Sequence, residues 1–256
     1  MKRSRFPQIV TLLGLLFLYI PILMLVLTSF NESKYGGVWG GFSLIWYKKL
    51  FQNEDVWKAL RNSLFIGVSA TLASTVIGTL AALALTKYKG FLQKLHYGMI
   101  YVPLIMPDIL MGISLLLFFV ALSFPLGLTT IFIAHTTFCI SYVTMVMLAR
   151  LQQFDWALIE AAEDLGADTW QMFWKVMMPL LTPGLLAGAL LAFTLSIDDF
   201  VITFFVSGPG STTLPLFVYS SLKFGSPSII NALSVLVLLI TFTVLWLSQR
   251  LTTEKP

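Results

Sequence analysis

Charged residues are scarce in this chain: they make up 11% of its 256 residues, whereas 57% are hydrophobic. Soluble domains contain about 25% charged residues, so the composition excludes an ordinary soluble domain. Cysteine occurs once, inside an apolar run, which excludes an intramolecular disulfide and makes Cys139 a small core residue. The net charge of +4 requires no nucleic-acid partner, because membrane proteins carry excess Lys and Arg on their cytoplasmic side.

Sequence motifs of catalysis are also missing. The chain has no G-x-x-x-x-G-K-[ST] phosphate loop, no cluster of metal ligands and no nucleophile elbow. The Gly-rich run at residues 208–212 lacks the lysine that a phosphate loop needs. We therefore expect no catalytic residue, no bound metal and no cofactor. If the chain takes part in ATP-driven transport, a partner must supply the ATPase site.

Six apolar stretches are long enough to cross a membrane as helices, which takes about 20 residues. They lie at residues 9–30, 63–85, 97–120, 129–149, 184–206 and 229–251. The first follows basic residues as a signal peptide does, but it has the length of a full span and no small-x-small cleavage site follows it. We predict an all-α integral membrane protein in which residues 1–256 form one domain of six spans.

The basic residues indicate the orientation of these spans. With Arg250 at the inner end of the last run, the two terminal segments and the loops at 86–96 and 150–183 hold ten Lys and Arg, whereas the loops at 31–62 and 207–228 hold six. Because cytoplasmic loops carry the excess, we place the first group, with both termini, in the cytoplasm. The aromatic-rich segment 31–62 then lies outside. We expect it to form a short amphipathic helix on the membrane surface, a docking site for an external protein, or both.

Small residues recur at every fourth position in two of the apolar runs. Such faces let helix backbones approach closely where no hydrophobic effect drives association, and we expect them to pack against other spans. They are Ala70, Ser74, Gly78 and Ala82 in the second run, and Gly184, Gly188, Ala192 and Ser196 in the fifth.

Three carboxylates stand within the apolar runs: Asp108 in the third, and Asp198 and Asp199 in the fifth. Apart from Arg250 at the inner end of the last run, no Lys or Arg lies in any of them. A charge at membrane depth is costly and normally faces a cavity or marks a pathway. We expect these acids to line the path of a cationic substrate or of protons. The alternative is that they are protonated, or hydrogen-bonded to backbone freed near a proline kink.

The positions of the acids along straight helices can be estimated. At about 1.5 Å per residue, Asp108 lies roughly 16 Å and Asp198 roughly 21 Å from the inner ends of their runs, at similar heights. On a helical wheel Asp199 falls on the small-residue face, with Asp198 about 100° away. We therefore expect Asp199 to pack against a neighbouring helix and Asp198 to face the passage. His135 in the fourth run is interpreted as a hydrogen-bonded packing residue.

The polar segment between the fourth and fifth runs has the pattern of two short helices joined by a turn. Asp155 can cap a helix over 156–165, and Gly166 stands where a helix C-terminus needs a residue tolerant of positive φ. Asp168 and Gln171 have the spacing of a capping box that opens a second helix. The apolar side chains of this segment, three tryptophans among them, predict a surface that meets protein or the lipid interface.

This segment also resembles the EAA loop of ABC importer permeases, a motif that reads E-A-A, three residues, G, nine residues, I, one residue, L-P. The matching positions are Glu160, Ala161, Ala162, Gly166, Val176, Met178 and Pro179. Two of them differ from the motif, Val for Ile and Met for Leu, and both changes keep an apolar side chain. The resemblance implies a type I ABC importer permease in which this segment forms coupling helices that contact an ATPase.

The resemblance covers essentially the whole chain and implies further partners. A permease of this family would sit in the bacterial inner membrane with a second, homologous permease chain. It would also bind a dimer of cytoplasmic ATP-binding subunits and a periplasmic substrate-binding protein.

Within that family, the runs at 107–109, 135–139 and 196–199 are similar to the permeases for spermidine and putrescine. That similarity implies polyamines as cargo and a polyamine-binding protein as the periplasmic partner. Polyamines are cationic at neutral pH, which agrees with the unpaired acids. One alternative is the same importer with another cargo, such as ferric ion, thiamine or an amino-phosphonate. Another is a proton-coupled secondary transporter, which needs no ATPase but would show inverted repeats.

Overall fold

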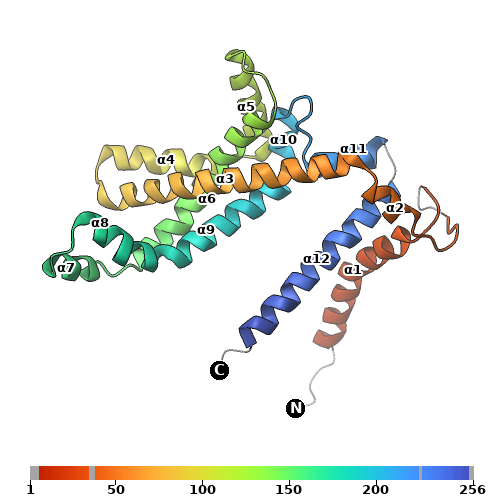
Figure 1. Cartoon of the computed structure of the whole chain (residues 1–256), viewed down its shortest axis with the longest axis horizontal. Helices are drawn as coiled ribbons and strands as arrows, with labels where there is room; N and C mark the ends of the chain where they lie inside the picture. The colour runs from red at the N-terminus through yellow and green to blue at the C-terminus, as the bar shows by residue number, and fades with distance from the viewer. Residues whose placement is uncertain (1–5, 35–37, 225–226, 254–256) are drawn as a thin grey trace. The chain divides into compact units, whose positions relative to one another are not determined.

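A computed structural model of the chain describes residues 6–34, 38–224 and 227–253. The chain divides into two compact units, one made of Met1–Trp57 with Phe217–Pro256 and the other of Lys58–Leu216. All the regular elements of the described residues are helices (Figure 1). Helices α3 (Glu54–Lys87) and α11 (Leu214–Phe224) cross the division, so parts of each belong to both units.

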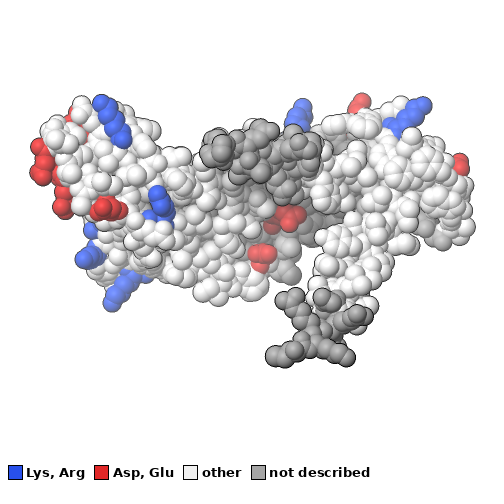
Figure 2. Space-filling model, turned by 90° about the horizontal axis from the view of Figure 1, so that it is seen from below, with Lys and Arg blue, Asp and Glu red and all other residues white. Residues whose placement is uncertain are grey.

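The larger unit, residues 58–216, contains most of the helices. They are α3, α4 (Phe91–Ile105), α5 (Asp108–Ala121), α6 (Leu128–Gln152), α7 (Ala157–Asp164), α8 (Thr169–Gln171), the π-helix η1 (Met172–Met177), α9 (Met178–Asp198) and α10 (Val201–Val206). Charged side chains gather over the α7–α8 end of this unit and are sparse along its long helices (Figure 2). That distribution is the one expected of helices that lie in lipid with a polar loop in water.

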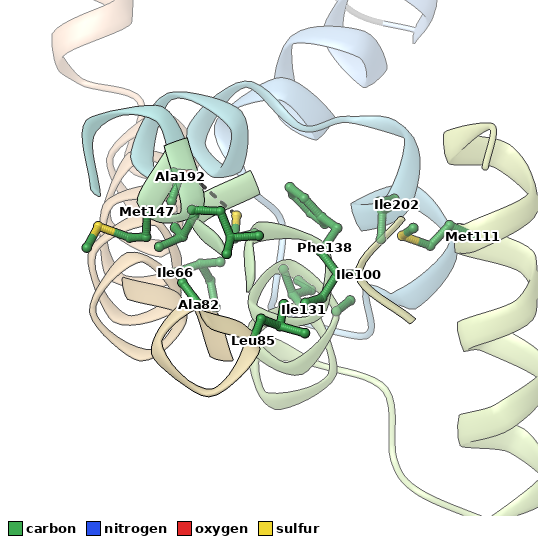
Figure 3. Close-up of a cluster of buried hydrophobic side chains, with 14 of the residues drawn as sticks. Ile66, Ala82, Leu85, Ile100, Met111, Ile131, Phe138, Met147, Ala192 and Ile202 are labelled. Carbon is green, nitrogen blue, oxygen red and sulfur yellow. Dashed lines mark hydrogen bonds between the residues drawn. The ribbon is translucent and has the colours of Figure 1, made fainter. Parts of the chain in front are cut away.

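Helix α6 is the centre of this unit. Its side chains Ile131, Phe138 and Met147 lie in a buried cluster together with residues of α3, α4, α5, α9 and α10 (Figure 3). Cys139 is fully buried there, and its Sγ donates to the carbonyl oxygen of Ala192 at 3.5 Å. This agrees with the predicted role of Cys139 as a small core residue.

The two small-residue faces predicted from the sequence are buried, and both meet α6. A Cβ atom at Gly78 of α3 would lie 2.9 Å from Val143 Cβ, and one at Gly188 of α9 would lie 3.4 Å from Val143 Cγ1. A Cβ atom at Gly184 would lie 2.9 Å from Arg150 Cγ. The absence of side chains at these glycines therefore lets α3 and α9 approach α6 from two sides.

The third apolar run does not form a straight helix. The chain bends by 113° between α4 and α5, and the bend is visible in Figure 1. Pro107 explains the break, because proline disfavours the helical conformation for the residue before it, and Met106 is extended with ψ of 131°. Asp108 is the first residue of α5, so the depth estimated for it along a straight helix is wrong.

The fifth run is also broken, because α9 ends at Asp198 and α10 begins at Val201. Asp199 is extended at this point, with ψ of 122°. Helix α5 packs along α10, and Gly112 permits the close approach: a Cβ atom there would lie 2.6 Å from Phe205 Cδ2. Figure 3 shows Met111 of α5 beside Ile202 of α10. The two broken runs thus pack against each other next to their breaks.

The smaller unit consists mainly of α1 (Phe6–Ser29), α2 (Ile45–Phe51) and α12 (Pro227–Thr253), with α1 and α2 both packed on α12. Trp46 and Leu50 of α2 are buried, and Trp46 Nε1 donates to the Asn31 carbonyl oxygen at 2.8 Å. The short helix expected within residues 31–62 therefore exists. Phe51 remains exposed, as do Trp39 and Phe42 before the helix.

Within the described residues, four helices are long and apolar enough to cross a membrane, or five if α4 and α5 count as one bent span. The apolar helix Pro227–Thr243, within α12, falls among the shorter ones of 10–17 residues. The all-helical membrane fold predicted from the sequence is therefore observed, whereas the number of six spans is not confirmed.

Substitution of Gly78 tests the packing of α3 on α6. Gly78→Ala forces Val143 or the α6 backbone to move, and overpacking of this kind costs about 1–3 kcal/mol. We expect a lower thermal unfolding midpoint for the purified protein in detergent. Gly98→Ala in α4 is the control, because its Cβ atom would meet nothing within 4 Å. Equal midpoints for both variants would contradict the packing described here.

Candidate functional site

A pocket of about 310 Å³ lies where the two broken runs meet. Its wall includes Asp108, Asp198 and Asp199, together with Tyr142 and Phe138 of α6. Every charged residue that lines it is an acid, although the rest of residues 58–216 carry seven Lys and Arg. The structure thus brings together all three carboxylates that the sequence analysis selected, and the helix breaks are what place them side by side.

Asp108 and Asp198 present free carboxylates to this pocket. Both are exposed, and within residues 58–216 neither makes a hydrogen bond or ion pair. Asp108 begins α5, where the unpaired backbone N–H groups of the first turn favour a negative charge. Asp198 ends α9, a position that leaves its side chain beside the break. These two groups are available to a cation that enters the pocket.

Asp199 is bound by its surroundings, as the helical wheel suggested. Its Oδ2 accepts hydrogen bonds from Thr203 N and Thr203 Oγ1, both at 2.8 Å, and lies 3.2 Å from His135 Nε2. Its Oδ1 accepts a longer bond of 3.3 Å from Ile202 N. The carboxylate therefore caps the first turn of α10 and joins it to α6.

The interpretation of all three acids as lacking a basic partner is therefore wrong for Asp199. His135 is a basic residue, but its charge depends on protonation, and the count of Lys and Arg left it out. As predicted, it is a hydrogen-bonded packing residue: it is 1% exposed, and its Nδ1 lies 2.7 Å from Ser196 Oγ. The sequence held only a partial signal, because His135 is the only histidine in the apolar runs and Asp199 is one of the three acids there.

The loop between α6 and α9 has the helix–turn–helix form expected. Gly166 has a φ of 82°, and its N–H donates to the Glu163 carbonyl oxygen while Ala167 N donates to the Ala162 oxygen. These two bonds form a Schellman motif, which closes α7 with a residue in the left-handed region. Asp155 Oδ1 accepts from Ala157 N at 3.0 Å at the other end of the helix.

The second helix of the loop begins as the sequence predicted. Asp168 Oδ1 accepts from Gln171 N at 2.7 Å, which is the N-cap half of the expected capping box. The helical course then continues from α8 through η1 into α9. Pro179 does not interrupt it, because this proline stands in the first turn of α9. The loop is therefore continuous with a membrane helix on its C-terminal side.

The loop exposes apolar side chains, as predicted. Trp156, Trp170 and Trp174 are all exposed, and Leu165 is 89% exposed. Between the loop and the end of α3 lies a mainly apolar pocket of about 520 Å³, whose wall includes Trp156, Phe173 and Lys87. An exposed surface of this kind beside polar helix caps is typical of a protein contact.

Arg150 closes the base of this loop, which the sequence analysis did not foresee. Its Nε and Nη2 donate to the Leu180 carbonyl oxygen at 3.2 and 2.7 Å, and Gly184 packs on its side chain. The last turn of α6 and the first turn of α9 are thereby joined where the chain leaves and re-enters the helical bundle. The only sequence signal for this contact is an arginine at the end of an apolar run. The excess of basic residues on the cytoplasmic side already accounts for an arginine there.

Three kinds of comparison relate this chain to known proteins. Residues 74–253 match the family model described as "Binding-protein-dependent transport system inner membrane component". The chain is 45% identical over 243 residues to the "Putrescine transport system permease protein PotI" of Escherichia coli strain K12, covering 92% of this chain and 86% of that protein. It is 39% identical over 239 residues to the "Spermidine/putrescine transport system permease protein PotC" of Haemophilus influenzae, with 93% of both chains covered.

Solved structures resemble the fold at lower sequence identity. A chain of a bacterial ABC transporter involved in the import of the acidic polysaccharide alginate is similar with a TM-score of 0.74 and 18% identity, and 98% of each chain is covered. A chain of the MetNI methionine ABC transporter is similar with a TM-score of 0.61 and 18% identity, covering 82% of this chain and 97% of that chain.

The different surroundings of Asp199 and Asp198 predict different effects on stability. Asp199→Ala removes a carboxylate that accepts bonds from α10 and leaves those donors unsatisfied, which costs roughly 1–3 kcal/mol. We expect a lower unfolding midpoint in detergent. Asp198→Ala is the control and should leave the midpoint unchanged, because Asp198 makes no hydrogen bond within residues 58–216. A larger loss for Asp198→Ala would overturn the assignment.

Proposed function

The chain belongs to the family of inner-membrane components of binding-protein-dependent transport systems, and on this premise we propose that it is the permease subunit of an ATP-driven importer for polyamines. The main evidence for the identity of the cargo is the similarity to relatives named as putrescine and spermidine/putrescine permeases. This similarity extends over more than 90% of the chain. As a permease it contributes the translocation path, and ATP is hydrolysed by a partner subunit.

The chemistry of the acidic pocket supports the same cargo independently. A putrescine or spermidine molecule carries ammonium groups along a flexible aliphatic chain. Asp108 and Asp198 offer two unpaired carboxylates, and the aromatic rings of Phe138 and Tyr142 lie in the same wall. Carboxylates bind ammonium groups and aromatic faces attract cations. A ferric ion would favour several oxygen ligands in a compact cluster, whereas this pocket also offers apolar surface for methylene groups.

The proposed assembly follows from the family. It contains a second homologous permease, a dimer of cytoplasmic ATP-binding subunits and a periplasmic polyamine-binding protein, all at the bacterial inner membrane. In this assembly residues 1–256 act as one domain of six spans, with α12 as the sixth and the bent pair α4–α5 as the third. Both termini and the loops at 86–96 and 150–183 face the cytoplasm, in accordance with the basic residues.

The loop from Asp155 to Pro179 is proposed as the coupling element that contacts the ATPase. Glu160, Ala161 and Gly166 of the EAA-like pattern are exposed, so they are accessible to another subunit. Ala162 is partly exposed and supplies the carbonyl oxygen for the Schellman motif. Val176, Met178 and Pro179 stand at the junction of η1 and α9, where the loop joins the membrane helix. These positions connect a docking surface to the span that ends at the acidic pocket.

Substitution of Gly166 tests the coupling role. Proline cannot adopt the φ of 82° and removes the N–H that bonds to Glu163, so Gly166→Pro should break the turn between α7 and α8. We expect uptake by the reconstituted importer to fall at least about tenfold relative to ATP hydrolysis, the loss expected when about 1.4 kcal/mol of coupling is removed.

Gly90→Pro is the matched control, because Gly90 also has a positive φ, of 113°, and its surroundings are open. It lies in the shorter loop between α3 and α4, outside the EAA-like pattern. Equal loss of coupling in both variants would show that a general distortion of the cytoplasmic loops is responsible.

Substitution of the free carboxylates tests the cargo path. Asp108→Asn and Asp198→Asn should each lower putrescine uptake into liposomes by roughly tenfold or more, since each removes one of the two unpaired carboxylates that line the pocket. Uptake is normalised to assembled complex, and assembly should be unchanged. Asp55→Asn, an exposed acid at the start of α3, is the control. Normal uptake by both pocket variants would remove the electrostatic argument for a cationic cargo.

A further inference from the structure

His135 lies behind the wall of the acidic pocket and joins both sides of the break in the fifth run. Its Nδ1 lies 2.7 Å from Ser196 Oγ before the break, and its Nε2 lies 2.9 Å from Thr203 Oγ1 after it. Its Nε2 is also 3.2 Å from Asp199 Oδ2 at the break itself. The imidazole is 1% exposed and is not part of the pocket lining, so it acts on a cargo only through these partners.

Asp199 contacts His135 and also lines the acidic pocket. Its carboxylate is held by His135 and Thr203 on one side, and the same residue lines the pocket that holds Asp108 and Asp198. The charge that a cargo meets in this pocket therefore depends on how far His135 compensates Asp199. With compensation the pocket offers two net negative charges, and without it three.

The hydrogen bonds around His135 accommodate its positively charged form. Thr203 Oγ1 donates its proton to Asp199 Oδ2, so toward His135 it can only accept. Both partners of Nε2 are therefore acceptors, so Nε2 carries a proton. On the other side of the ring, the Ser196 hydroxyl can accept a hydrogen bond from a protonated Nδ1. The bonds around the ring therefore accommodate the imidazolium form that compensates Asp199.

We propose that His135 is a specificity-determining residue: by compensating Asp199 it leaves two free carboxylates for the two ammonium groups of a diamine. Loss of this compensation adds a third negative charge to the pocket and favours a triamine. The proposal rests on the proposed function, because it concerns the choice among polyamines at the same pocket. His135 is a positioning residue in this scheme, since it never touches the cargo.

The test compares two cargos on the same reconstituted full complex. For wild type and His135→Gln, the specificity constants for spermidine and putrescine are measured separately, with uptake normalised to assembled protein. The glutamine amide still donates to Asp199 but carries no charge. We expect the spermidine-to-putrescine ratio to rise on the order of tenfold, the size expected for one partly buried charge. A merely structural role for His135 would lower both constants and leave their ratio unchanged.

If His135 compensates the charge of Asp199, neutralising Asp199 as well should restore the wild-type ratio. In the double variant His135→Gln with Asp199→Asn, both members of the pair are neutral, so the pocket again offers two charges and the ratio should return to the wild-type value. Thr136→Val is the matched control: it is a neighbouring, buried residue of α6 whose hydroxyl has no partner, so its removal should not change the ratio. His135→Asn provides a second neutral variant if the glutamine variant does not assemble.

The outcomes separate this proposal from the proposed function. If the wild-type complex takes up neither polyamine, the proposed function fails. If it takes up both, and His135→Gln leaves the ratio unchanged or the double variant keeps the ratio of His135→Gln, the role assigned to His135 is overturned while the polyamine importer stands.

Discussion

A charged or unpaired polar group inside a membrane must be satisfied by the protein itself, because lipid offers no hydrogen bonds. That requirement organises the larger unit of this chain. Two apolar runs break near their middle, at Met106–Pro107 and at Asp199–Phe200, and each break sets free backbone groups and carries an acid. The breaks lie against each other through α5 and α10, so the freed groups and the carboxylates share one small polar region.

The three carboxylates respond to this constraint in different ways. Asp199 is satisfied by α10 and by His135, and in return it fixes the course of the chain across the break. Asp108 and Asp198 are left without protein partners in the described chain, and each of them faces the pocket. A site for a cation is thus produced by two broken helices. The alternative considered from the sequence, that the acids are hydrogen-bonded to freed backbone, holds for Asp199 alone.

Features set by neighbours in the sequence could be predicted. The apolar runs, the two small-residue faces, the positive φ at Gly166 and the cap at Asp168 all depend on local patterns, and each is observed. The remaining features depend on residues far apart in the chain. A proline kink near Asp108 could be expected, but the bend of 113° could not, because it depends on where α5 packs against α10. The pairs His135–Asp199 and Arg150–Leu180 required the register between α6 and α9, which no local pattern supplies.

That register has a mechanical consequence. Helix α9 is fastened to α6 at two levels, by Arg150 at Leu180 and by His135 at Ser196, which are about 24 Å apart along the helix axis at 1.5 Å per residue. Two attachments so far apart prevent one helix from pivoting or twisting on the other, and Gly188 packed on Val143 lies between them. We therefore expect α6 and α9 to move together as one body. We expect the width of the acidic pocket to change through its opposite wall, where α5 follows the break at Met106–Pro107.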